Sequence, residues 1–212
     1  MQSSEGYSCT SLRDWKDLTD AVIVGRVVAE SSFLGSTSSV PEPLVGRLIT
    51  VAVDRVLFSA RPVPDQMTVL TLGWQTDEQG ERHPLVGDSG SRLEVGDALI
   101  GAFDQEPTKP GVWFSPGETA CTVLVSNGTV TVPAQAREYQ QSLAGLRADD
   151  MVARILAEPV DPASVRYRDL PAMKRLEKIL TAREQSTTSS TSSTSSTSST
   201  SPTTLTTPTT GG

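Results

Sequence analysis

The chain has 212 residues, of which 36% are hydrophobic and 20% are charged, and its formal net charge is −7. No stretch approaches the roughly 18 consecutive apolar residues that a membrane-spanning helix requires, so we expect no membrane span in the chain as given. Two cysteines and one histidine exclude a multi-disulfide framework, a four-thiolate zinc site and any site that needs two histidines.

A short helix and a central strand are the first elements predicted along the chain. Residues 12–18 place large apolar side chains on one helical face, and Ser11 is a suitable N-terminal cap. Residues 21–29 are nearly all apolar and rich in valine, a pattern that favours a strand covered on both faces. Gly25 inside this strand indicates a bend of the kind that a small barrel needs.

Short strands separated by turn signals follow, without intervening helices. We expect them at residues 47–58, 66–74, 98–103, 112–114, 121–125 and 129–132. Asn127–Gly128, between the last two, is the dipeptide that type I′ hairpin turns prefer. With Thr129 it also matches a glycosylation sequon, but the turn alone explains these residues. The pattern predicts a mainly β fold, either a closed antiparallel barrel or a sandwich.

Two longer segments, residues 34–44 and 75–91, lack a helix or strand pattern. The first contains Gly35, Pro41 and Pro43, and the second is polar and rich in glycine. Because long connections without secondary structure are uncommon in compact domains, we expect loops that are either mobile or functional.

The apolar spacing becomes helical after the last strand. Apolar residues within 151–156 and 173–180 recur at intervals of three and four, which predicts two or three helices, with Gly145 separating the first from the second. The helices are expected to pack on the barrel or on one another.

The C-terminal segment is of a different kind, because 22 of the 27 residues in 186–212 are Ser or Thr. It has almost nothing apolar to bury, so we expect a disordered stalk or linker. The expected organisation is therefore a barrel domain at 9–132, a helical extension at 133–185 and this tail at 186–212.

The motifs that could carry catalysis are incomplete. Residues 87–91 resemble the GDSGG nucleophile segment of chymotrypsin-like proteases, but the only histidine, His83, lies in the same loop, whereas a serine nucleophile needs a rigidly held base. His83 is interpreted as an exposed loop residue, and Asp149 and Asp150 as carboxylates that favour a helix start. No phosphate loop, dinucleotide fingerprint or HExxH motif is present. We therefore expect no catalytic site, cofactor or metal.

The charge distribution also bears on the partner. Residues 1–136 carry 17 acidic and 9 basic side chains, whereas nucleic-acid binding requires a basic surface that neutralises phosphates. We expect no nucleic-acid partner.

Cys9 and Cys121 are the most informative pair in the sequence. A bridge between them would close a loop of about 110 residues and contribute on the order of 4–5 kcal/mol in the chain-entropy model. The alternative is two free thiols, which lack the neighbours that make cysteines reactive. We favour the disulfide, which implies an oxidising compartment. Residues 1–5 are not a signal peptide; taken literally the chain is cytoplasmic, so an extracytoplasmic location implies that a leader has been removed.

The order of these features resembles a known family. Cys9 precedes a short helix, and the strands 20–28 and 49–57, the segment 95–100 and a late Cys121 follow. Together they resemble the netrin-module or tissue-inhibitor-of-metalloproteinase-like OB-fold domains of secreted bacterial proteins, over roughly 9–132. The resemblance implies a small closed antiparallel barrel of OB or netrin-like type, joined to a low-complexity linker.

The inhibitory mechanism of the animal members does not carry over with the resemblance. They chelate the zinc of their target through an N-terminal cysteine, but eight residues precede Cys9 here. The animal inhibitors also use several disulfides, whereas this chain allows one.

The expected function is a non-enzymatic extracytoplasmic binding or interaction module for an unknown protein or surface ligand. Its contact surfaces would be residues 34–44 and 75–91, because OB barrels bind through loops and one face. One alternative is a netrin-related protease inhibitor with Cys9 as the contact residue. Another is an OB-type nucleic-acid binder, which the acidic charge and the few aromatic residues disfavour.

Overall fold

The computed structural model describes residues 9–34, 44–85, 91–170 and 172–191. Its strands are β1 (Ala21–Leu34), β2 (Leu44–Ser59), β3 (Gln66–Thr76), β4 (Arg82–Pro84), β5 (Ala98–Gln105), β6 (Val112–Phe114), β7 (Thr122–Ser126) and β8 (Thr129–Thr131). Its helices are α1 (Leu12–Asp17), α2 (Glu138–Gln141), α3 (Ala148–Ala157), α4 (Pro162–Arg166), α5 (Ala172–Thr191) and the 3₁₀ helix η1 (Pro116–Thr119). Within these residues, no helix combines the length and the apolar character needed to cross a membrane.

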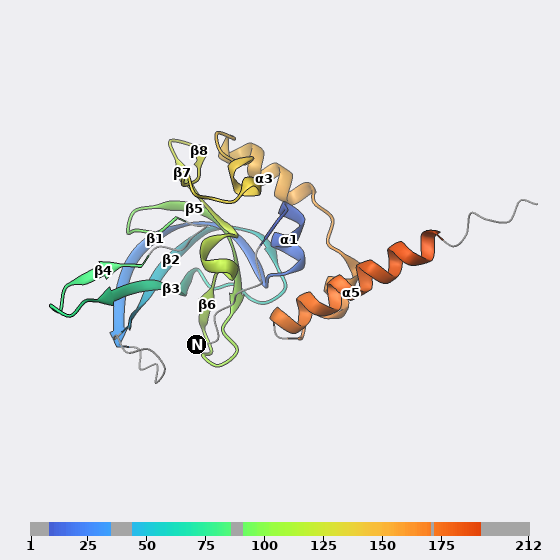
Figure 1. Cartoon of the computed structure of the whole chain (residues 1–212). Coiled ribbons are helices and arrows are strands. Elements are labelled where there is room, and N and C mark those ends of the chain that lie inside the picture. The colour runs from blue at the N-terminus through green and yellow to red at the C-terminus, as the bar shows by residue number, and fades with distance from the viewer. Residues whose placement is uncertain (1–8, 35–43, 86–90, 171, 192–212) are drawn as a thin grey trace, which may run out of the picture.

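Five strands close into a barrel, as the sequence predicted, with helices outside it (Figure 1). Strands β1, β2 and β3 form an antiparallel meander, β3 pairs with β6, β6 with β5, and β5 closes the ring on β1. The expectation of a wholly antiparallel barrel is wrong at one pairing, because β6 runs parallel to β3. Each antiparallel neighbour reverses the strand direction, so a ring with an odd number of strands must contain a parallel pair.

The barrel interior is filled by alternate residues of its strands, as the two-residue period of a strand dictates. Ala21 and Ile23 of β1 point inward, where Phe103 and Trp113 are also buried. Val22, between the two inward residues, belongs to a different cluster outside the barrel. The continuous apolar run of β1 is thus explained, since both of its faces are covered.

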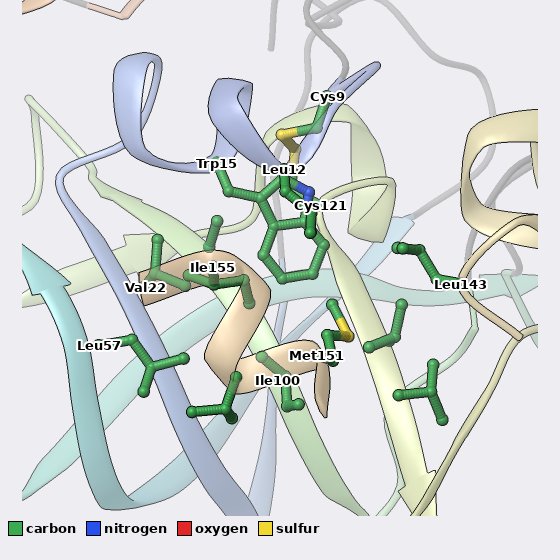
Figure 2. Close-up of a cluster of buried hydrophobic side chains, with 14 residues drawn as sticks. Cys9, Leu12, Trp15, Val22, Leu57, Ile100, Cys121, Leu143, Met151 and Ile155 are labelled. Atoms are coloured by element: carbon green, nitrogen blue, oxygen red, sulfur yellow. A yellow bond between two sulfur atoms is a disulfide. The ribbon is translucent and has the colours of Figure 1, made fainter. Parts of the chain in front are cut away.

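That second cluster joins the N-terminal segment to the outer barrel wall. Trp15 of α1 and Met151 and Ile155 of α3 pack over β1 and β5, and the cystine lies at one end of the cluster (Figure 2). The predicted helix at 12–18 is confirmed, and the Ser11 side chain accepts a hydrogen bond from the Asp14 amide as its cap.

The strands extend further than the sequence indicated. Strand β1 continues to Leu34 and β2 begins at Leu44, so both ends of the segment 34–44, which was expected to be a loop, belong to strands. Residues 35–43 lie outside the described part. Part of 75–91, expected to be a loop, is a β-hairpin in which β4 pairs with the end of β3. The turn at Asn127–Gly128 is confirmed, with φ values of 51° and 74°.

The C-terminal extension holds four described helices where two or three were expected. Gly145, at φ 80°, lies between α2 and α3, where the sequence placed a break. Helix α5 continues to Thr191, six residues into the Ser/Thr-rich segment. Residues 192–212, most of the expected disordered tail, lie outside the described part.

Candidate functional site

The predicted disulfide between Cys9 and Cys121 is present, with the two Cα atoms 5.4 Å apart. Both residues are buried, at 1% and 0% exposure. The bond ties the segment before α1 to the start of β7 (Figure 2). Its role in the fold is to fix the N-terminal helix against the barrel wall.

A pocket of about 300 Å³ lies where one end of the barrel meets the C-terminal extension. Its wall is formed by Asp20, Arg61, Asp104, Gln105, Glu106, Pro107, Pro110, Phe114, Asp169, Leu170 and Arg175. A larger hollow of about 660 Å³ lies beside the β7–β8 hairpin, but neither of its charged residues, Arg26 and Asp97, is buried. The first pocket is therefore the candidate site, because buried charges that line a pocket are typical of functional sites.

The paired barrel strands bring two carboxylates to this end. Asp20 immediately precedes β1, and its backbone amide donates to the Phe103 carbonyl on β5. Asp104 follows Phe103 in β5, and β5 pairs with β1, so the two aspartates lie at the same end of this strand pair. Both are buried, at 4% and 1% exposure.

Arg175 of α5 bridges the two carboxylates. One terminal nitrogen of its guanidinium donates to Asp20 Oδ1 at 3.0 Å and the other to Asp104 Oδ1 at 2.8 Å. Asp20 Oδ2 accepts the Gln105 amide at 3.2 Å and lies 3.3 Å from Arg61 Nε. Asp104 Oδ2 is the only buried carboxylate oxygen of the described residues that has no hydrogen-bond partner.

Burial dominates the electrostatics of Asp104. Loss of solvent raises its pKa from 3.8 to about 7; the nearby negative charge of Asp20 adds to this, and Arg175 opposes it. The folded chain therefore holds a proton on Asp104 at pH values at which the unfolded chain has lost it.

This gives an expected pH dependence of stability. The free energy of unfolding should fall as pH rises from about 4 to 7, by up to about 1.4 kcal/mol per pH unit, because the folded state binds more protons than the unfolded state over this range. Asp104→Asn should remove that slope, since Asn cannot titrate. Urea unfolding at several pH values checks this, and an unchanged slope in the variant would contradict it.

A second ionic cluster fastens α5 further along. Arg183 donates to Asp17 Oδ2 at 2.7 Å and to Asp161 Oδ2 at 3.0 Å. Ile179, halfway between Arg175 and Arg183, is fully buried against Leu18. The docked face of α5 thus repeats every four residues, with one apolar contact between two ionic ones.

The structure places His83, the only histidine, outside this pocket. Its Nε2 lies 2.8 Å from Asp77 Oδ2 in the β3–β4 hairpin, and its side chain is exposed, as the sequence predicted. Glu81 completes a group whose ligand atoms lie within 4.8 Å of one another. Hydrogen bonds from backbone amides and His83 already occupy Asp77, so this group is explained as a turn that holds itself together. Residues 86–90, which include most of the protease-like segment, are not described.

A buried arginine inside the strands was also not predicted from the sequence. Arg47 of β2 is 0% exposed and pairs with Glu30 and Glu94 at 2.5 and 2.9 Å. Its guanidinium carbon lies 5.8 Å from the Trp74 ring centre, and Arg92 covers the same ring at 4.9 Å. These contacts connect β1, β2 and β3 with the segment before β5 and have a structural role.

None of the charged residues that line the pocket was predicted as a site residue from the sequence. The expected contact surface was at 34–44 and 75–91, and no described residue of these two segments lines the pocket. One signal was available: Arg175 and Ile179 are four residues apart on the helix that follows Pro171, so an arginine shares the face expected to be buried. A buried arginine requires buried carboxylates, but the sequence does not say which ones.

Comparison with known proteins adds no family assignment. No protein-family model matches the chain, and no curated protein is significantly similar to it in sequence.

Proposed function

We propose that the chain is a non-enzymatic binding module that works outside the cytoplasm through the pocket at the end of its barrel. The observation that carries the proposal is Asp104, a buried carboxylate in the pocket wall with one oxygen free of hydrogen bonds. Among the described residues, the wall contains no Ser, Thr, Cys or His side chain that could serve as a nucleophile with its base. The carboxylates of the wall and the side-chain amide of Gln105 are groups that can bind a ligand reversibly.

The finer fold assignment is part of the same proposal. The ring order β1-β2-β3-β6-β5 with return to β1 supports an OB-type barrel, which is a five-stranded Greek-key arrangement. A disulfide that links the N-terminal segment to such a barrel supports the netrin-like resemblance.

The disulfide also supports an extracytoplasmic location. Structural disulfides persist in oxidising compartments and are rare in the reducing cytosol. In this chain both cysteines are buried and paired.

A capture experiment with two charge reversals tests the proposed function. The full-length protein, immobilised, is exposed to proteins secreted by or displayed on the source cells. Asp169→Lys changes an exposed residue of the pocket rim, and Glu81→Lys makes the same change in the exposed β3–β4 hairpin. We expect a partner that the wild type and Glu81→Lys retain and Asp169→Lys loses.

The two variants distinguish binding at the pocket from binding at the segment 75–91. If Glu81→Lys alone loses the partner, the proposal that the pocket is the contact surface is wrong, and the expectation that 75–91 is the contact surface is restored. Capture of nothing by the wild type would overturn the binding module itself.

A further inference from the structure

We propose that the barrel-end pocket binds an alkylammonium group, as carried by a lysine side chain, and that Asp104 Oδ2 accepts a hydrogen bond from it. This inference rests on the proposed binding function and specifies the chemistry of what is bound. Three properties of the pocket lead to it: the balance of charge in its wall, the apolar surface beside the charges and the acceptor capacity that remains.

The charge of the wall favours a cation. Four carboxylates line the pocket, from Asp20, Asp104, Glu106 and Asp169, against the guanidinium groups of Arg61 and Arg175. The formal balance is −2, so an anionic ligand would be repelled. A single positive charge lowers this imbalance to −1, at low cost because the buried acids are already desolvated.

The remaining acceptors favour a compact cation with one main contact. Asp20 uses both oxygens, on Arg175 and on Gln105 with Arg61 beside it. Glu106 Oε1 accepts from the amide and hydroxyl of Thr108. Asp104 Oδ2 has no such partner and lies on a residue that is 1% exposed.

An ammonium group meets this demand better than the other cations. A guanidinium prefers a two-oxygen fork, and Arg175 already occupies the fork between Asp20 and Asp104. A hard divalent cation needs several oxygen ligands at once, whereas the buried part of the wall offers one uncommitted carboxylate oxygen, Asp104 Oδ2, beside two guanidinium groups. Ammonium is a point charge with three donors and can use a single strong acceptor.

The apolar part of the wall fits the carbon chain that carries the ammonium. Phe114 closes the pocket on the β6 side, and Pro107 and Pro110 come from the loop between β5 and β6. Leu170 contributes from the segment before α5. A short alkyl chain would pack on these groups while its charged end reaches Asp104, as a lysine side chain does when its stem is buried.

Binding should strengthen as pH rises through about 7. The charged groups near Asp104 are Asp20 before β1 and, from the C-terminal extension, Arg168 and Arg175. Arg61, after β2, pairs with Asp20. Burial raises the pKa of Asp104 to about 7. Its ionised form attracts an ammonium ion, and its protonated form does not.

The test is a titration of full-length protein followed by amide chemical shifts in nuclear magnetic resonance spectra. The probes are n-butylammonium and N-acetyl-lysine-N-methylamide, with butyrate and guanidinium as comparison ions of opposite charge and different shape. We expect saturable shifts at residues 104–110 with both amines, and none that saturate with butyrate or guanidinium. If butylammonium binds and the lysine derivative does not, the ligand is a free amine, and the proposal that a lysine side chain carries the ammonium group is wrong.

Variants assign the contact. Asp104→Asn keeps the shape and should weaken amine binding about tenfold or more, as loss of a charged hydrogen bond predicts. Glu106→Gln changes a pocket residue outside the Arg175 bridge and should weaken amine binding less than Asp104→Asn does. It replaces Asp104→Asn as the test variant if Asp104→Asn folds poorly. Glu177→Gln removes an exposed charge of α5 outside the pocket wall and should bind as the wild type does.

The outcomes separate this inference from the proposed function. Absence of saturable shifts with either amine, or equal affinity of Asp104→Asn, overturns the ammonium site. If partner capture still depends on Asp169, the binding function stands and only the ligand chemistry fails. If amines bind but no partner is captured, the ammonium site stands and the protein-binding function fails.

Discussion

Removal of the Cys9–Cys121 bond should lower the free energy of unfolding by about 5 kcal/mol, because the bond closes a long loop in the unfolded chain. The two cysteines are 112 residues apart in sequence, which makes the loop almost as long as the barrel domain. Both are buried next to Leu12 and Trp15 (Figure 2), so alanine at both positions keeps an apolar contact while it breaks the link.

A set of three variants isolates the contribution of the link. Cys9→Ala, Cys121→Ala and the double variant should lose nearly the same free energy in urea or guanidinium unfolding, because either single change already opens the loop. Losses that add between the two positions would instead indicate independent packing effects. A double variant within about 1 kcal/mol of the wild type would contradict the loop-closure account.

The features predicted correctly from the sequence are those with local causes. The apolar strand at 98–103, the cap at Ser11 and the Asn127–Gly128 turn each depend on residues a few positions apart, and the structure has all three. The disulfide was predictable for a different reason: two cysteines allow only one intramolecular pairing.

The features that were missed have long-range causes. The parallel pairing of β6 with β3 follows from the number of strands in the ring, which no single segment of sequence encodes. The ionic bridge joins Arg175 to Asp20 and Asp104 across 155 and 71 residues. Each of these residues, taken alone, has the usual character of an exposed charge, and only their burial together distinguishes them.

The bridge predicts the second large effect. Arg175→Met should destabilise the protein by about 3–5 kcal/mol at neutral pH, because it removes the guanidinium that bridges the buried carboxylates of Asp20 and Asp104 and leaves Arg61 beside Asp20 only. Methionine fills much of the same space, so the loss is electrostatic in origin. Arg175→Lys should lose less, since it keeps the charge but cannot span both carboxylates with a planar fork.

A neutral triple variant is the decisive control. Asp20→Asn and Asp104→Asn combined with Arg175→Met remove the three charges of the bridge, and replacement of a buried ion triad often costs little. We expect the triple variant to regain most of the stability that Arg175→Met loses. The loss in Arg175→Met should also shrink as pH falls below 7, because Asp104, whose pKa burial already raises to about 7, then takes up a proton and loses its uncompensated charge. Denaturant unfolding at several pH values measures both effects, and hydrogen exchange in α5 shows whether the helix leaves the barrel. A triple variant no more stable than Arg175→Met would mean that Arg175 acts through packing and not through the two carboxylates.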